Sequence, residues 1–333
     1  MKQNLKFYLK NKLSKKELEF VPSSFDVVGD ILIFSDFPRE LTKKEKIIGQ
    51  TILENYHHIK TILKKTKKYS GRFRTPKLKV IAGEKRKETI CKENNVLIKL
   101  DVEKVYLSPR MSSERKRIVS LIKPNESVLV MFSGSGVYPL VIAKNSKCKE
   151  VYGIEINPIA HKYALENVKK NKLENKIKLF LGDVKKIMPK LSKKFDMSVN
   201  RKAISAEMSE REHGVKRAKA SFRMSRELSH VDACENAHAR VQLTAQKPLV
   251  FDRILMPLPK GGEYFLDLAL KYIKNKGIIH FYDFLHEDEF YKAEEKVKSA
   301  CKKHKKNFKI LKTTKCGQYS PRFYRVCVDF LVD

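Results

Sequence analysis

Residues 127–136, SVLVMFSGSG, are the most informative stretch of this 333-residue chain, because an unbroken apolar run ends there in a glycine-rich turn. A run such as VLVMF is typical of a parallel strand buried on both faces of its sheet. Gly134 and Gly136 would let the backbone approach a ligand closely, and Glu155 follows 21 residues after Gly134 at the end of the next predicted strand. An acid at that place can accept hydrogen bonds from both ribose hydroxyls of a nucleotide cofactor. The stretch therefore predicts a nucleotide-cofactor site.

The same pattern favours S-adenosylmethionine over NAD as the cofactor. The third glycine of a dinucleotide-binding turn is missing, and Asp183 follows the third predicted strand, where it could accept a hydrogen bond from the adenine amino group. We also assign Phe132, the residue before the turn, to this cofactor site. The alternative is a plain glycine turn with two solvated acids at the strand ends.

Outward from this turn, helical and strand patterns alternate from Ser112 to the end of the chain, with EVYGIE, KIKLFLGD and GIIHFYDF as further strands. This alternation predicts a Rossmann-like, doubly wound α/β domain over residues 111–333. Residues 1–110 are predicted to form a small α+β domain. In it, residues 25–35 form a hairpin, residues 41–65 a helix with one apolar stripe, and three short strands follow up to residue 108.

Residues 197–250 interrupt the alternation, because they contain no strand-like apolar run and separate KKFD from RILMPLP. We interpret them as a flexible insertion, or else as an artefact of sequence assembly. His230, Cys234 and His238 are spaced four apart and could line one helical face as metal ligands. Ordinary solvated side chains are the favoured interpretation, and no metal is predicted.

The charge of the chain favours a polyanionic partner. Lys and Arg total 71 against 38 acidic residues, a formal net charge of +33, and nucleic acid is the expected partner. The alternative is a lysine-rich protein with a solvated basic surface. No apolar run reaches the roughly 18–20 residues that span a bilayer, and no signal peptide is recognisable, so a cytoplasmic protein without membrane contact is expected. The six cysteines contain no CxxC pair, which indicates reduced thiols.

The loop after the fourth predicted strand reads Met256-Pro257-Leu258-Pro259. It is similar to the N-P-P-[YF] loop with which methyltransferases of amino and ring nitrogens hold a flat base. Prolines would make such a loop rigid at low entropic cost, and Pro257 and Pro259 are therefore assigned to the cofactor and substrate pocket. A simple turn is the alternative.

Several longer motifs together resemble the archaeal and eukaryotic tRNA guanine-37 N1-methyltransferase family, and most of all its archaeal branch in wyosine synthesis. They are FDVVGD, FRTPKLKVIAGE, DVEKVYLSPRMSSER, MFSGSG, GIEINP, MPLPKGG, HFYDFLHED and YSPRFYRVCVDF. The resemblance covers residues 25–333 apart from the insertion. It implies a monomeric enzyme that transfers a methyl group from S-adenosylmethionine to N1 of guanosine 37 in the tRNA anticodon loop. The wyosine precursor 4-demethylwyosine at the same position is the implied second substrate.

The resemblance also implies roles for single residues. Arg74 would stabilise charge on the guanine O6, Glu114 would be the general base for N1, and Tyr106 would line the methionine and base pocket. The alternatives are a phosphate contact for Arg74 and a helix-capping role for Glu114. The chain departs from the family pattern where Pro257 replaces an asparagine and Val130 an aspartate, and it is too short before residue 25 for the domain that grips the tRNA elbow.

Two other functions remain open at this point. The cofactor turn would serve equally in a methyltransferase of another RNA or of a protein side chain. The chain could also be an RNA-binding protein whose catalysis is impaired by the insertion.

Overall fold

The computed structural model describes residues 4–71, 73–193, 249–258 and 260–333. Residues 1–187 and 251–333 form one compact unit, and residues 188–250 form a second. Nearly all of the predicted insertion 197–250, including His230, Cys234 and His238, lies outside the described residues. The domain boundary that the sequence predicts near residue 110 remains a prediction.

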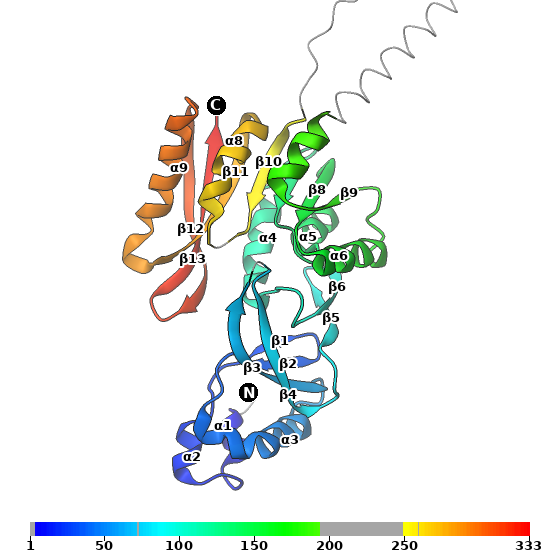
Figure 1. Ribbon diagram of the computed structural model, residues 1–333, viewed down its shortest axis with the longest axis vertical. Coiled ribbons are helices and arrows are strands. Elements are labelled where there is room, and N and C mark those ends of the chain that lie inside the picture. Colours follow the sequence, from blue (N-terminus) through cyan, green and yellow to red (C-terminus); the bar gives the residue numbers. More distant parts are fainter. Residues whose placement is uncertain (1–3, 72, 194–248, 259) are drawn as a thin grey trace, which may run out of the picture. The chain divides into compact units, whose positions relative to one another are not determined.

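A seven-stranded sheet forms the centre of the first unit (Figure 1), with the strand order β12-β13-β11-β10-β7-β8-β9. Strands β11, β10, β7, β8 and β9 are parallel, whereas β13 and β12 are antiparallel to their neighbours. Chain order reverses between β7 and β10, and such a switch point opens a crevice at the carboxyl ends of the strands. The strands are β7 (Ser127–Met131), β8 (Glu150–Glu155), β9 (Ile177–Leu181), β10 (Phe251–Met256), β11 (Ile273–His286), β12 (Phe308–Ser320) and β13 (Phe323–Val332).

The helices of this part form two groups. Helices α4 (Ser112–Ser120), α5 (Val137–Asn145) and α6 (Pro158–Lys170) pack in sequence, and α5 and α6 also pack against β8 and β9. Helices α8 (Leu266–Tyr272) and α9 (Tyr291–Lys303) pack against each other and against β11. The predicted doubly wound fold is confirmed. Within the described part of the chain, no helix has the length and apolar character needed to cross a bilayer.

The N-terminal part contains a second sheet of order β1-β2-β3-β4 and a separate ribbon of β5 and β6. Its elements are α1 (Leu5–Leu9), α2 (Lys15–Glu19), β1 (Asp26–Val28), β2 (Ile31–Phe34), α3 (Glu45–Asn55), β3 (Thr61–Ser70), β4 (Thr75–Gly83), β5 (Glu88–Glu93) and β6 (Val96–Asp101). Short 3-10 turns lie at Arg39–Lys44, Pro109–Met111, Gly262–Phe265 and Glu287–Glu289. The predicted hairpin at residues 25–35 is present as β1 and β2.

The helix predicted over residues 41–65 is wrong beyond Asn55. Residues from Thr61 onward form β3, which pairs parallel with β2 and antiparallel with β4. Ile59 and Leu63 fit the three- or four-residue apolar spacing, but they are buried in the sheet core. β-Branched Thr61 and Ile62 favour the strand. Pairing of β3 with β2 and β4 therefore outweighed the helix-like spacing of the apolar residues.

Two asparagines, Asn167 within α6 and Asn171 directly after its last residue, attach the β5–β6 ribbon to this helix. The Asn167 side chain accepts from the backbone N–H of Lys99 at 2.7 Å and donates to the carbonyls of Lys99 and Ser135 at 2.9 and 3.1 Å. Asn171 makes the matching pair of bonds with Leu97. The fully buried Asn167 thereby ties the ribbon to the glycine turn, and the segment after the ribbon then enters the crevice.

Candidate active site

A cavity of about 460 Å³ lies at the carboxyl ends of β7, β8, β10 and β11. Its walls come from the turns after β7, β8 and β10, from β11 and β13, from Gly71, Phe73 and Arg74, and from residues between Tyr106 and Met111. Among the predicted site residues, the lining includes Arg74, Tyr106, Phe132, Gly134, Glu155 and Pro257. Gly136, Asp183 and Glu114 are not among the lining residues, and Pro259 is outside the described part of the chain.

The two glycines of the turn have different roles. Gly134 has a φ of 57°, and a Cβ built on it would have only the Tyr106 carbonyl oxygen within 4 Å, at 3.9 Å. Gly136 has a φ of 81° and precedes α5, and a Cβ there would lie 3.2 Å from the Cβ of Ala164 on α6. Gly134 therefore leaves open space on the cavity side, whereas Gly136 allows α5 and α6 to pack closely.

Glu155 is the last residue of β8, and its carboxylate joins two turns of the cavity wall. One oxygen accepts the N–H of Gly134 and the other that of Asn157, both at 2.7 Å. Burial raises the pKa of Glu155 above the ordinary 4.5, while these N–H groups act in the opposite direction. Each carboxylate oxygen has a further lone pair with which it can accept a ligand hydroxyl.

Asn157 is a cavity-lining residue that the sequence interpretation did not single out. Its side-chain oxygen caps α6 by accepting the N–H groups of Ile159 and Ala160, and its amide donates to the Lys104 carbonyl at 2.9 Å. An asparagine directly before Pro158 is a recognisable helix start. That signal could have placed it at the mouth of the crevice.

Asp183 lies beyond the end of β9 and takes part in a local turn. Its carboxylate accepts the N–H of Lys185 at 2.9 Å. The preceding Gly182 donates its N–H to the Glu155 carbonyl at 2.8 Å, so the ends of β8 and β9 are adjacent. The contact with adenine expected of Asp183 remains a prediction.

The proline loop and Arg74 meet at the other side of the cavity, although 186 residues separate Arg74 from Lys260 in the sequence. The Arg74 guanidinium donates to the Lys260 carbonyl at 3.0 Å. Pro257 follows β10 directly, and Phe132, with a φ of 62°, places its ring edge-on to Phe265 at 4.8 Å between centroids. The cofactor turn, the proline loop and Arg74 thus line one pocket.

Arg325 of β13 is a further lining residue that the sequence did not indicate. It donates to the Tyr106 hydroxyl at 3.0 Å and lies 4.8 Å from the ring centre of Phe284. It is only 8% exposed, and its Nε has no hydrogen-bond partner within the described residues. A buried N–H of this kind is available to an anionic or carbonyl group of a ligand.

Glu114 of α4 is buried behind the cavity wall, because only 3% of the residue is exposed. Arg117 holds its carboxylate with two hydrogen bonds, of 2.6 and 2.7 Å. The Tyr282 hydroxyl donates to the same carboxylate at 2.7 Å, and Tyr282 does line the cavity. The predicted base is therefore separated from the cavity by one tyrosine.

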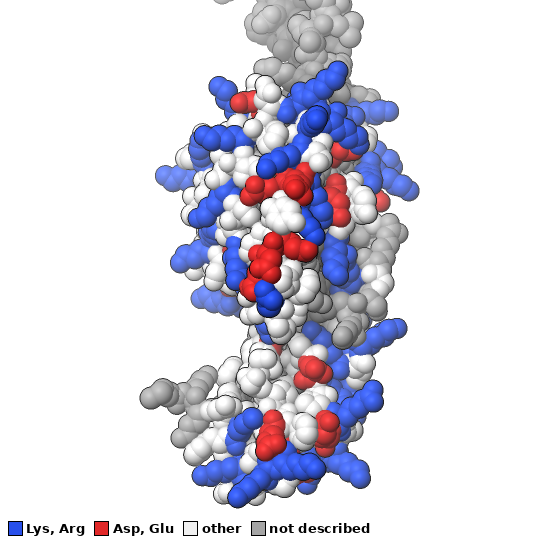
Figure 2. All heavy atoms as spheres, turned by 90° about the vertical axis from the view of Figure 1, so that its left-hand side faces the viewer, with Lys and Arg blue, Asp and Glu red and all other residues white. Residues whose placement is uncertain are grey.

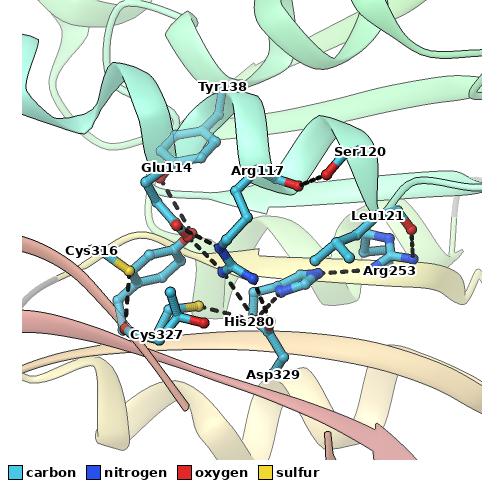
Figure 3. Close-up of polar contacts among 12 residues, drawn as sticks. Glu114, Arg117, Ser120, Leu121, Tyr138, Arg253, His280, Cys316, Cys327 and Asp329 are labelled. Carbon is cyan, nitrogen blue, oxygen red and sulfur yellow. Dashed lines mark hydrogen bonds and ion pairs between the residues drawn. The ribbon is translucent and has the colours of Figure 1, made fainter. Parts of the chain in front are cut away.

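Arg117 extends this contact into a buried polar network (Figure 3). Its guanidinium also binds Asp329 at 2.5 Å, Asp329 contacts His280 Nδ1 at 2.6 Å, and His280 Nε2 contacts Arg253 at 2.8 Å. Burial lowers the pKa of His280, opposed by the bond to Asp329. A neutral ring that donates from Nδ1 and accepts at Nε2 satisfies both partners.

The same region has a geometry that could suit a metal, since ligand atoms of His280, Cys327 and Asp329 lie within 4.8 Å of one another. However, Arg253 occupies the free nitrogen of His280, and Arg117 pairs with Asp329. Two guanidinium groups repel a further cation, so this cluster is an ion-pair network.

Two family models match this chain, one over its N-terminal part and one over most of the rest. The TRM5/TYW2 methyltransferase domain matches residues 89–209 and 213–311, and the TYW2 N-terminal domain matches residues 5–86. The chain belongs to the TRM5/TYW2 methyltransferase family. The family, fold class and enzyme class predicted from the sequence are confirmed.

Three curated relatives in this family have named activities. Trm5b of Pyrococcus abyssi, a tRNA (guanine(37)-N(1))-methyltransferase, is 32% identical over 94% of this chain and 76% of its own length. Taw22 of Nanoarchaeum equitans, named for both guanine-37 N1 and 4-demethylwyosine methylation, is 37% identical over 83% of this chain and 87% of its own length. A Methanocaldococcus jannaschii tRNA(Phe) (4-demethylwyosine(37)-C(7)) aminocarboxypropyltransferase is 29% identical over 92% of this chain and 96% of its own length.

Solved structures of TRM5/TYW2 proteins have the same fold. A complex of aTrm5 with tRNALeu aligns with a TM-score of 0.72 at 27% identity, over 100% of this chain and 79% of that one. A complex of Methanocaldococcus jannaschii TYW2 with AdoMet aligns with a TM-score of 0.58 at 25% identity, over 93% of this chain and 99% of that one. The predicted cofactor and nucleic-acid class are those found in these family members.

Proposed function

We propose that this member of the TRM5/TYW2 family transfers a methyl group from S-adenosylmethionine to N1 of guanosine 37 in tRNA. One observation carries the proposal: Glu155, Arg74 and the Pro257 loop line a single cavity at the switch point of the sheet. A cavity of about 460 Å³ is within the range of roughly 300–1,000 Å³ that small-molecule sites occupy.

The cofactor fits the residues on the β7 and β8 side of this cavity. Glu155 offers carboxylate lone pairs to ribose hydroxyls, and Gly134 leaves space that a side chain would fill. When bound, S-adenosylmethionine supplies a methyl group on a positively charged sulfur.

Methylation of guanine N1 requires loss of the N1 proton, and negative charge then develops on O6. A carboxylate can accept the proton, and a guanidinium can stabilise the oxygen. We assign these roles to Glu114 and Arg74. Pro257 would restrict the loop that faces the base, because its ring fixes the backbone φ.

The tRNA would be bound largely through charge. Figure 2 shows Lys and Arg side chains over much of the face in view, with acidic side chains in smaller groups between them. The net charge of the whole chain is +33. We propose that a monomer acts on the anticodon loop in the cytoplasm without a metal ion.

The deciding experiment incubates the full chain with methyl-labelled S-adenosylmethionine and an unmodified tRNA bearing G37, followed by nucleoside mass spectrometry. We expect 1-methylguanosine, and no label in a matched tRNA with A37. Label in another nucleoside would indicate a different RNA methyltransferase. Tight tRNA binding without label would indicate an RNA-binding protein, and an aminocarboxypropyl product would indicate the activity of the Methanocaldococcus jannaschii relative.

We propose 4-demethylwyosine at the same position as a second substrate. The support is the 37% identity to Taw22, whose name includes both reactions, together with Pro257 in place of the asparagine of the family loop. The same assay on tRNA that carries 4-demethylwyosine tests this. A methylated tricyclic nucleoside is the expected product, and its absence alongside active guanine methylation would restrict the enzyme to guanosine.

A further inference from the structure

The predicted base and the cavity are connected through one side chain. Glu114 is not among the cavity-lining residues, and its carboxylate oxygens accept bonds from Arg117 and from the Tyr282 hydroxyl. Tyr282 lies on β11, where the preceding Phe281 pairs with Met256, the last residue of β10. The tyrosine is therefore level with the start of the proline loop, where the target base would lie.

We propose that the Tyr282 hydroxyl relays the proton of the target base to Glu114. The inference rests on the proposed function. As the bond from sulfur to the methyl carbon breaks and the bond to N1 forms, the N1 proton passes to the Tyr282 oxygen. The tyrosine's own proton passes to Glu114. The products are the methylated base, S-adenosylhomocysteine and a protonated Glu114, and Tyr282 ends as a neutral phenol.

The surroundings of Tyr282 favour a relay in which the phenol never accumulates as an anion. Burial raises the pKa of Tyr282 well above 10.0, and the neighbouring Cys327, Tyr138, Glu114 and Cys316 raise it further. A phenol in that environment stays protonated at rest. It can pass on a proton only while it accepts another, which makes the two transfers concerted.

Arg117 connects Glu114 to a second carboxylate. Arg117 carries one positive charge between two carboxylates, those of Glu114 and Asp329. With His280 neutral, and Arg253 paired with Glu126, the network holds one excess negative charge before transfer and none after it. Asp329 keeps Arg117 in a paired state once Glu114 is neutral.

Glu114 and Tyr138 together fix the direction of the Tyr282 hydroxyl. The Tyr138 hydroxyl donates to the Tyr282 oxygen at 3.3 Å, and the two rings pack edge to face. Since Glu114, held by two bonds to Arg117, can only accept from Tyr282, the Tyr282 proton points toward Glu114. Tyr138 occupies one acceptor position of the Tyr282 oxygen, and the remaining lone pair is available to an N–H donor from the cavity.

The test is a double-mutant cycle of Tyr282→Phe and Glu114→Gln in the full chain, read by single-turnover methyl transfer to G37 tRNA. If Tyr282 acts through Glu114, each single variant should lose roughly 10²–10⁴-fold in rate, the usual contribution of a positioned base. The double variant should then be no slower than Glu114→Gln alone, because residues that act as a unit are non-additive. Multiplied losses would overturn the relay.

The pH profile provides a readout that a packing role would not change. Tyr282→Phe should show a rate that rises with pH up to the highest value the protein tolerates, because hydroxide must then remove the N1 proton. A profile parallel to that of the wild type would overturn the relay. Tyr272→Phe on α8, which also removes a buried tyrosine hydroxyl, is the matched control and should keep the wild-type rate and profile.

Thermal unfolding and S-adenosylmethionine calorimetry show whether Tyr282→Phe still folds. Should it fail to fold, 3,5-difluorotyrosine at position 282 keeps the hydroxyl while lowering its pKa, and the relay then predicts a shifted pH profile. A wild-type rate in Tyr282→Phe, or an unshifted pH profile with 3,5-difluorotyrosine, overturns the relay alone. Absence of methyl transfer by the wild-type chain overturns the proposed function and the relay with it.

Discussion

Replacement of Glu155 by Gln should weaken S-adenosylmethionine binding by about 10- to 150-fold. The carboxylate accepts two backbone N–H groups at 2.7 Å, one from each turn. An amide keeps one acceptor and turns an N–H₂ group toward the other N–H, so the turn must shift and the ribose loses a charged acceptor. A hydrogen bond to a charged group contributes about 1.5–3 kcal/mol, and 1.4 kcal/mol is a factor of ten in affinity.

Titration calorimetry of the cofactor into wild-type and variant protein measures this loss directly. Glu150→Gln is the matched control, because Glu150 begins the same strand and pairs with Lys178 instead; its affinity should stay within twofold of wild type. Since burial raises the pKa of Glu155, wild-type affinity should also fall as the pH drops through that raised value, and the variant should lack this dependence. A Glu155→Gln affinity within threefold of wild type would refute the cofactor assignment.

Four further outcomes follow from the site. Glu114→Gln should bind tRNA and cofactor normally yet lose roughly 10²–10⁴-fold in single-turnover rate, with partial rescue at high pH. Arg74→Ala should lower that rate by about 10²–10³-fold, more than it weakens tRNA affinity; an arginine that contacts only phosphate would give the reverse. Filter-binding titrations should show tRNA affinity falling steeply with salt, since a chain of charge +33 releases counterions, and a flat dependence would argue against a nucleic-acid substrate. Burial alone would raise the pKa of Asp329, but bonds from His280 and Arg117 hold this pKa below the usual 3.8. The ionised Asp329 therefore stabilises the fold above pH 3.8, and this stabilisation is lost as the pH falls through the lowered pKa. In urea unfolding, Asp329→Asn should therefore be about 3–5 kcal/mol less stable at neutral pH and less sensitive to acid than wild type.

The sequence predicted the sheet and the strand-end residues because both depend on local patterns. Glycines follow VLVMF at the carboxyl end of β7, and Glu155 is the last residue of β8. Because the two strands are parallel neighbours, the topology alone brings the glycines and Glu155 together. The helix from 41 to 65 failed because apolar spacing at Ile59 and Leu63 does not distinguish a helix face from a buried strand. Pairing with β2 and β4, which decided the outcome, involves residues far away in the sequence.

The burial of Glu114 could not be predicted from its own neighbourhood. Tyr282 and Asp329, which contact Glu114 and its partner Arg117, follow Glu114 by 168 and 215 residues. A G-x-G pattern likewise does not reveal that Gly134 faces the cavity while Gly136 packs against α6. Arg325 gave no signal because its contact with Tyr106 depends on the position of the antiparallel β13.

The order of the strands separates the two chemical tasks of the site. Across the sheet, Tyr282 lies on β11, Pro257 follows β10, Gly134 follows β7 and Glu155 ends β8. Neighbouring strands are about 4.8 Å apart, so three steps from β11 to β8 span roughly 14 Å. In the proposed mechanism, that width separates the groups that would handle the proton from those that would hold the nucleoside of the cofactor, with the proline loop between them. A base held at Pro257 would thus face a methyl donor from the β7 and β8 side and a proton acceptor from the β11 side. Changes in the central loop could therefore alter which base is accepted without disturbing either flank.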